Sequence, residues 1–229
     1  MLLLASCEDK ESSQEDNSVL HEKHLEITDT VQKENPQNLD SSRQEERGPL
    51  VQEELIPFLT DFGEKNPEDR IRITSQFGDI EVQLYHDTPL HRANFIYLVK
   101  NNYFENTVFH RVTENFVVQG GNSDNPETNQ KRAKIGDYLI PSEFEAGHPH
   151  VRGAFSAAKY TEQNVSKASS PFEFFIVQSE NGAHHLDNDH TVFGRVTKGM
   201  DVVDEISKLP TDGQDWPIRN IFIDVELIE

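Results

Sequence analysis

Residues 109–121 read FHRVTENFVVQGG, and no other stretch of this 229-residue chain says as much about its fold. It carries the cation Arg111 and the amide Gln119 among apolar residues, as two short strands near 109–111 and 116–119 would. Because Phe116 lies five residues after Arg111, across a short turn, we expect the two side chains on adjacent strand segments. Gln119 is two positions after Val117 and should therefore face the same way.

Upstream of this stretch, residues 70–85 alternate apolar and polar side chains. Ile71 and Ile73 share one face of a strand, a turn follows at 77–79, and Ile80, Val82 and Leu84 repeat the pattern. This spacing predicts a β-hairpin.

Two helices are predicted in the chain. Thr88 can cap a helix that starts at Pro89, where the missing N–H costs nothing, and that runs to about Lys100. A second, shorter helix fits residues 200–207. Further short strands are expected near residues 154–157, 174–178, 192–196 and 221–228. Many strands and two helices without regular β-α alternation favour a mainly β fold, a closed antiparallel barrel.

Three blocks together resemble the cyclophilin family of peptidyl-prolyl isomerases. They are residues 109–121, the run FEFFIV at 172–177 and the run HLDNDHTVFG at 185–194. They occur in the order of the family with comparable spacing, preceded by Ala93-Asn94-Phe95 and followed by GMDVV at 199–203. The resemblance covers residues 70–229. It implies an eight-stranded antiparallel barrel with one α-helix covering each open end.

The chemistry of prolyl isomerisation fits these residue types. An X-Pro bond crosses a barrier of about 18–20 kcal/mol that amide resonance holds up. A site lowers the barrier by favouring the twisted state, in which the prolyl nitrogen gains a usable lone pair. A fixed cation that donates a hydrogen bond to this nitrogen serves the purpose, and arginine suits it because its planar fork stays charged when partly buried. No cofactor is required.

The resemblance assigns roles to individual residues. It implies that Arg111 is the donor, that Gln119 orients Arg111 and the substrate backbone, and that His110 supports the site. The remaining substrate-binding positions that it implies are Phe116, Val117, Ala158, Lys159, Glu173, Phe175, His185, Leu186 and His190. Among these, an apolar pocket for the proline ring is assigned to Phe116, Val117, Phe175 and Leu186. Phe174 is expected in the barrel core, because it points to the opposite face from Phe175.

Four positions depart from the family pattern. Val117 stands in place of the usual methionine and should widen the pocket, and Lys159 replaces an asparagine whose role is largely through its backbone. His185 replaces the tryptophan of many eukaryotic members. Glu173 replaces a glutamine, and its carboxylate could pair with Arg111 and weaken the field of Arg111 on the substrate.

The first fifty residues differ sharply from the rest. They hold twelve acidic against five basic residues and no Phe, Tyr or Trp. Such a segment cannot bury enough apolar surface to offset its ordering entropy, so residues 8–50 are expected to form a disordered acidic tether, with a pair of solvated helices as the alternative. Residues 51–69 are expected to be a short helical lead-in to the domain at 70–229. The formal net charge of −20 argues against nucleic-acid binding.

The only cysteine, Cys7, ends the run Leu4-Ala5-Ser6-Cys7, which resembles a bacterial lipobox. On this interpretation residues 1–7 are the remnant of a lipoprotein signal, Cys7 carries the lipid, and the protein is anchored to a membrane of the bacterial cell envelope. Only six residues precede Cys7, and none of them is Lys or Arg. The true start therefore lies upstream, or the protein is an ordinary cytoplasmic one. No apolar run approaches the length of a membrane span.

The sequence contains ten histidines, but their spacing matches no common zinc signature, so no metal site is predicted. The function that the resemblance implies is a monomeric, cofactor-free peptidyl-prolyl cis/trans isomerase. It would act on X-Pro segments of unfolded or extended chains during the folding of exported proteins. The alternative is a catalytically weak cyclophilin-like chaperone or scaffold that binds peptides.

Overall fold

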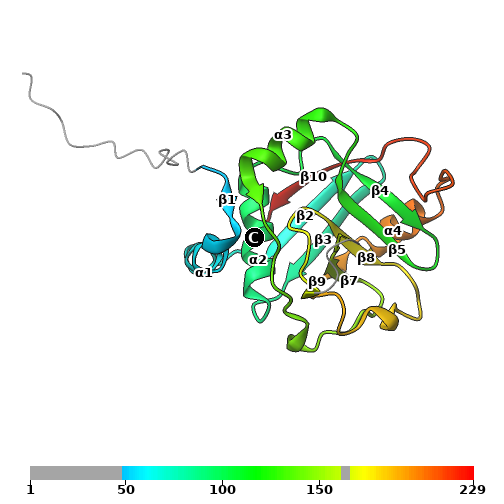
Figure 1. Cartoon of the computed structure of the whole chain (residues 1–229). Helices are drawn as coiled ribbons and strands as arrows, with labels where there is room; N and C mark the ends of the chain where they lie inside the picture. Colours follow the sequence, from blue (N-terminus) through cyan, green and yellow to red (C-terminus); the bar gives the residue numbers. More distant parts are fainter. Residues whose placement is uncertain (1–47, 161–165) are drawn as a thin grey trace, which may run out of the picture. The chain divides into compact units, whose positions relative to one another are not determined.

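A computed structural model describes residues 48–160 and 166–229, and Cys7 and residues 8–47 lie outside this part of the chain. Eight strands form a closed barrel in the order β10-β2-β3-β9-β7-β8-β5-β4, and every neighbouring pair is antiparallel (Figure 1). The predicted barrel is confirmed. The strands are β2 Arg70–Ser75, β3 Gly78–Leu84, β4 Thr107–Thr113, β5 Val117–Asn122, β7 Ala154–Ala157, β8 Phe174–Val177, β9 Val192–Lys198 and β10 Phe222–Leu227.

Both predicted helices are present, as α2 Pro89–Lys100 and α4 Met200–Ser207. Pro89 occupies the first turn of α2 as expected, but Thr88 does not cap the helix. Its hydroxyl donates instead to the carbonyl of Tyr85, at 3.3 Å. The described residues contain two further helices, α1 Leu55–Lys65 and α3 Pro126–Ile135, and none of the four is long and apolar enough to cross a bilayer.

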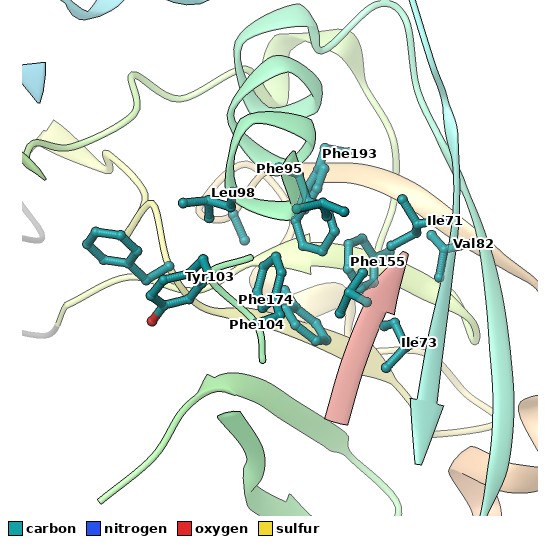
Figure 2. Close-up of a cluster of buried hydrophobic side chains, with 14 of the residues drawn as sticks. Ile71, Ile73, Val82, Phe95, Leu98, Tyr103, Phe104, Phe155, Phe174 and Phe193 are labelled. Atoms are coloured by element: carbon teal, nitrogen blue, oxygen red, sulfur yellow. The ribbon is translucent and has the colours of Figure 1, made fainter. Parts of the chain in front are cut away.

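The barrel interior is filled mainly by aromatic and β-branched side chains (Figure 2). The ring of Phe174 on β8 lies 4.8 Å from that of Phe155 on β7 and 5.7 Å from that of Phe95 on α2. Phe193 on β9 and Phe104 complete the group, at 4.9 Å from Phe155 and 4.8 Å from Phe95. Helix α2 therefore contributes directly to the core.

A second apolar cluster contains the residues that alternate with those of the interior. We call it the outer cluster; its buried members are Val117, Ala154, Ala158, Phe175, Val177, Ala183 and Val192, with Tyr85, Phe116 and Leu186 partly buried against it. Phe174 belongs to the interior and Phe175 to the outer cluster, because successive side chains of a strand point to opposite faces. The prediction that Phe174 is a core residue is confirmed.

The segment before the barrel starts one residue earlier than expected. Leu50 is almost fully buried, and β1 (Leu50–Val51) pairs in parallel with β6 (Gly136–Asp137), so Leu50 belongs to the folded part of the chain and not to a tether. A single 3-10 turn at Gln52–Glu54 leads into α1. Phe58 and Phe62 of α1 lie 5.1 and 5.4 Å from the ring of Tyr97 on α2.

Helix α3, at residues 126–135, was not predicted from the sequence. The side chain of Asn125 accepts a hydrogen bond from the backbone of Glu127, and Pro126 occupies the first turn. The helix ends at Gly136, whose φ of 133° suits glycine. Polar composition concealed the helix, although its start and stop signals are present in the sequence.

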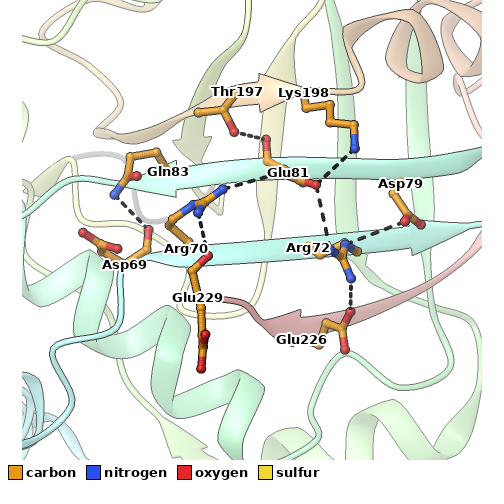
Figure 3. A network of polar contacts seen from close by, with 10 residues as sticks. All are labelled: Asp69, Arg70, Arg72, Asp79, Glu81, Gln83, Thr197, Lys198, Glu226 and Glu229. Atoms are coloured by element: carbon orange, nitrogen blue, oxygen red, sulfur yellow. Dashed lines mark hydrogen bonds and ion pairs between the residues drawn. The ribbon is translucent and has the colours of Figure 1, made fainter.

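The outer face of β2, β3 and β10 carries a network of ion pairs (Figure 3). Arg72 contacts Glu226 at 2.8 Å and lies 3.8 Å from Glu81, which also accepts from Lys198 at 3.4 Å. Arg70 lies 3.5 Å from Glu81. The arginines in this network are about one-third exposed or more, so each pair contributes at most about 1 kcal/mol to stability.

Candidate active site

The outer cluster borders a cavity of about 140 Å³. Nine of the twelve residues that the sequence assigned to the active site line it: Arg111, Phe116, Val117, Gln119, Ala158, Lys159, Phe175, Leu186 and His190. They come from β4, β5 and β8, from the segment after β7 and from the 3-10 turn at His184–Leu186 and the loop after it. Residues up to 79 positions apart are thus brought to one cavity by the closure of the barrel.

The other three assigned residues adjoin the cavity without lining it. The ring of His185 stacks against that of Phe116, with centroids 5.4 Å apart. His110 and Glu173 are buried next to Gln119, with side chains 9% and 12% exposed. These three residues are therefore placed to support the lining.

Two cations line the cavity, Arg111 and Lys159, and the more exposed of them is Arg111. It is the cross-strand partner of Gln119, and its side chain is 40% exposed. Its guanidinium carbon lies 5.7 Å from the centre of the Phe116 ring, and its Nε lies 3.5 Å from a carboxylate oxygen of Asp215. These contacts leave the two terminal Nη groups to donate to a ligand.

Asp215 is a site residue that the sequence analysis missed. Thr113 donates to its carboxylate at 3.0 Å, and the backbone N–H of Val112 donates to its carbonyl at 2.9 Å. The residue has a φ of 62°, in the left-handed region that aspartate tolerates in turns. It lies more than one hundred positions after Arg111, in a loop without regular structure, so no local sequence pattern predicted its contact with Arg111.

Glu173 does not pair with Arg111, as the sequence suggested it could. One of its oxygens lies 3.1 Å from Nη2 of Arg132, on α3. The other accepts from Nε2 of Gln119 at 3.1 Å and lies 3.5 Å from Nε2 of His110. Burial alone would raise the pKa of the Glu173 carboxyl, but His110 and Arg132 outweigh it and lower the pKa below its usual value. The carboxylate is thus engaged away from Arg111.

Phe175 is held between two histidine rings. His150 stacks on it at 5.8 Å with the planes 14° apart, and His190 meets it edge-on at 5.7 Å. Burial, followed by the charge of Lys159, lowers the pKa of His190 to about 4. His190 is therefore neutral at pH 7 and forms an uncharged wall of the cavity.

The charge of Lys159 is paired with a neighbouring carboxylate. Its side chain is only 4% exposed, and Nζ donates to Asp189 at 2.7 Å. The neighbouring Ala158 is fixed through its backbone, with its N–H donating to the carbonyl of Glu173 and its carbonyl accepting from Ser170. The substitution of asparagine by lysine at 159 thus adds an ion pair at the rim of the cavity.

A buried polar group lies behind Phe175 and was also missed. Nδ1 of His150 lies 2.8 Å from Asp187, and Nε2 lies 3.0 Å from the hydroxyl oxygen of Ser156. These distances are those of a Ser-His-Asp triad, but Ser156 is fully buried, so no substrate reaches its oxygen. The group holds the histidine that stacks on Phe175. Within residues 48–160 and 166–229, no cluster of three or more His, Cys, Asp or Glu side chains could hold a metal ion.

The eight-stranded barrel and the partly apolar cavity that Arg111 lines are what the resemblance to cyclophilin-type prolyl isomerases implies, and comparison with known proteins agrees. The family model described as cyclophilin type peptidyl-prolyl cis-trans isomerase/CLD matches residues 70–226. The chain therefore belongs to the cyclophilin-type peptidyl-prolyl cis-trans isomerase family. The match covers all of the barrel except the last residue of β10, and all of the residues that line the cavity.

Individual relatives support this assignment. A peptidyl-prolyl cis-trans isomerase of Acinetobacter baylyi is 39% identical over 145 residues, which cover 62% of this chain and 73% of that protein. The peptidyl-prolyl cis-trans isomerase-like 3 of Dictyostelium discoideum is 32% identical over 155 residues, which cover 67% and 91%. A crystal structure of a Cryptosporidium parvum cyclophilin type peptidyl-prolyl cis-trans isomerase, determined in the presence of the dipeptide Ala-Pro, superposes with a TM-score of 0.58 at 24% identity, covering 70% of this chain and 99% of that one.

Proposed function

We propose that this peptidyl-prolyl cis-trans isomerase works by donating a hydrogen bond from Arg111 to the prolyl nitrogen of a twisted X-Pro bond. The apolar cavity holds the proline ring while the bond rotates. The observation that supports this most directly is that Arg111 faces the cavity with both Nη groups uncommitted within the described residues. A donor that is fixed before the reaction stabilises charge at little reorganisation cost, and one such donor contributes about 10²–10³-fold in rate.

The proposed substrates are proline-containing segments of unfolded or extended polypeptides. The ring of Phe175, the side chain of Val117 and neutral His190 give the cavity apolar walls that suit a pyrrolidine ring. The solved cyclophilin from Cryptosporidium parvum was crystallised in the presence of Ala-Pro, which supports ligands of this class. One chain supplies all nine lining residues, so a monomer would be a complete catalyst.

One of the reasons for the alternative, a scaffold without useful turnover, was that Glu173 could pair with Arg111. Since the carboxylate of Glu173 is engaged by Arg132 and Gln119, that reason for impaired catalysis is absent. The isomerase is therefore the proposal that we carry forward.

The test is proline cis/trans exchange in a short Ala-Pro peptide, measured by NMR with the full chain. The Arg111→Ala variant should lose about 10²-fold or more of the catalysed rate, the scale of one pre-organised donor. Arg70→Ala is the matched control, because its side chain is 41% exposed against 40% for Arg111 and it lies on the outer face of β2. Full activity in Arg111→Ala would overturn the mechanism.

We further propose that the protein acts on exported chains from a membrane of the bacterial cell envelope, to which Cys7 is anchored by lipid. Support comes from the lipobox-like run before Cys7 and from the acidic, aromatic-free arm that follows. Slow prolyl isomerisation limits the folding of many exported chains, which suits an isomerase there.

The lipid anchor is tested by fractionation and mass spectrometry. Cys7→Ser should move the protein from the membrane to the soluble fraction without changing the exchange rate. An acyl mass on Cys7 would support the anchor. A chain that begins at unmodified Met1 and remains in the soluble fraction would contradict it and favour a cytoplasmic location.

A further inference from the structure

The amide of Gln119 is held in one direction. Its two ends differ chemically, since the NH2 group donates and the carbonyl oxygen accepts. Nε2 donates to Glu173 at 3.1 Å, and Gln119 lines the cavity as the cross-strand partner of Arg111. Among the described residues the amide oxygen of Gln119 has no hydrogen-bond donor of its own. It is left to face a ligand.

The carboxylate of Glu173 dictates this direction. An ionised carboxylate accepts hydrogen bonds and donates none, so the Gln119 amide can meet it only through its NH2 group. Nearby positive charge keeps the carboxylate ionised, because Nη2 of Arg132 lies 3.1 Å away. A glutamine at 173, the usual residue of the family, carries both a donor and an acceptor and imposes no such direction by itself.

Arg132 is itself fixed by several contacts. Its Nε donates to the hydroxyl of Tyr103 at 2.9 Å, its Nη2 reaches the carbonyl of Gly121 at 3.4 Å, and its guanidinium carbon lies 5.1 Å from the ring of Phe172. Its side chain is 19% exposed. Helix α3 thus supplies a cation that holds Glu173 in place.

We propose that Glu173, held by Arg132, is a positioning residue that fixes the polarity of the Gln119 amide, so that its carbonyl oxygen accepts a backbone N–H beside the substrate proline. The proposal rests on the proposed function of the cavity. A proline has no N–H of its own, so an acceptor at the cavity meets the N–H of a flanking residue. The cavity then offers one donor, Arg111, and one acceptor, Gln119, to a single peptide.

The variant Glu173→Gln should reverse this polarity. Arg132 only donates, so the new amide must give its oxygen to Arg132 and its NH2 group to Gln119. Gln119 must then turn its own oxygen away from the cavity and present NH2 to the substrate N–H. The added change Arg132→Met releases the amide at 173, so the double variant Arg132→Met/Glu173→Gln can adopt either arrangement.

The test measures NMR exchange and peptide affinity with the full chain. Glu173→Gln should lower kcat/KM about tenfold, since an acceptor is lost and a donor faces a donor. The double variant should recover about fivefold of this loss, because about half of the natural activity is expected when one of two equally populated amide orientations is again productive. Glu81→Gln is the matched control, because Glu81 is 15% exposed and surrounded by three cations on the far outer face of β3.

A second measurement separates positioning from a structural role. Two peptides are compared with the parent, each with one backbone N–H flanking the proline replaced by an ester oxygen. With the natural chain, one of the two ester peptides should isomerise more slowly than the parent peptide. With Glu173→Gln, that ester and the parent peptide should isomerise at the same rate. If neither ester shows this coupling, or if the double variant is less active than Glu173→Gln alone, the proposal fails. Absence of exchange in the natural chain would instead reject the proposed function.

Discussion

Phe174 and Phe175 are adjacent on β8 and almost equally buried, at 1% and 4% exposure, yet they belong to different regions of the molecule. Within the described residues, the aromatic rings around Phe174 are all phenylalanines, of which Phe155 is the nearest at 4.8 Å. The ring of Phe175 lies between His150 and His190. Burial alone does not distinguish the core from the site, whereas the chemistry of the neighbours does.

The barrel wall explains the difference. Side chains that point inward are enclosed on all sides by strands and by α2, so they can only be apolar and closely packed. Those that point outward from β5, β7 and β8 pack in one cluster with Ala183 and Leu186, and this cluster borders the cavity that His190 also lines. The interior therefore supplies stability, and the outer cluster supplies a cavity whose polar neighbours can be tuned.

The largest effect on stability should come from replacing one of the two phenylalanines by alanine. Phe174→Ala should lower the free energy of unfolding by about 3–5 kcal/mol, because it opens a cavity in a closed aromatic core. Phe175→Ala should cost less stability, since it borders an existing cavity, and should weaken binding of an Ala-Pro peptide. Urea denaturation and NMR titration measure the two quantities. Equal losses of stability in both variants would contradict the distinction between Phe174 as a core residue and Phe175 as a site residue.

A second prediction uses the histidine beside Phe175. The pKa of His190 is lowered to about 4 in the folded state, against its ordinary value of 6.5. Between these pH values the unfolded chain binds more protons at this residue, so the stability it contributes is complete above pH 6.5 and is lost as pH falls towards 4. The loss between pH 7 and pH 5 should be about 1–2 kcal/mol.

The variant His190→Gln tests this assignment. It should remove that part of the pH dependence, as measured by urea midpoints at pH 7 and pH 5. His86→Gln is the control, because His86 is 62% exposed on the side chain and lies before α2, away from Phe175. A pH dependence that survives in His190→Gln would place its origin elsewhere, with His150 as the next group to test, since burial also lowers its pKa.

The same comparison explains how far the sequence could lead. Period-two alternation predicted the hairpin of β2 and β3, because each of those strands has one enclosed face. It also separated Phe174 from Phe175. The resemblance to a known family supplied the lining residues that the barrel brings together.

What the sequence did not supply depends on long-range contacts of polar side chains. Arg132 lies in a polar segment, and nothing local shows that it reaches Glu173, 41 positions away. Asp215, which contacts Arg111, lies more than one hundred positions after it, in a loop. Helix α3 could have been found, since Asn125 and Pro126 at its start and Gly136 at its end are standard boundary signals.

A third, smaller effect concerns Lys159 at the rim of the cavity. Because the charge of Lys159 helps to lower the pKa of His190, Lys159→Asn should raise that pKa towards its usual value. An NMR titration of the His190 ring measures the shift directly. Catalysed exchange at pH 7 should change by about twofold or less, since the lysine charge is already paired with Asp189. A large loss of exchange would mean that the ammonium group itself contacts the substrate.

A similarly small effect should come from Asp215, whose carboxylate lies beside Arg111. The pair is 3.5 Å apart with both side chains about 40% exposed, a geometry worth about 0.2–1 kcal/mol. Because the carboxylate competes with the substrate for the guanidinium, Asp215→Asn should raise the exchange rate about twofold at low salt. The difference should vanish in 1 M salt, where the Debye length is about 3 Å.

The control for that measurement is Asp79→Asn, since Asp79 lies 3.7 Å from Arg72 at a similar exposure on the outer face of β2 and β3. It should leave the exchange rate unchanged at either salt concentration. A lower rate in Asp215→Asn at both concentrations would mean that the carboxylate orients Arg111 more than it competes for it. Asp215 would then act on Arg111 as Glu173 acts on Gln119, by holding a side chain of the cavity in position. The rim of the cavity at Asp215 would in that case be a fixed part of the site and not one that can be varied freely.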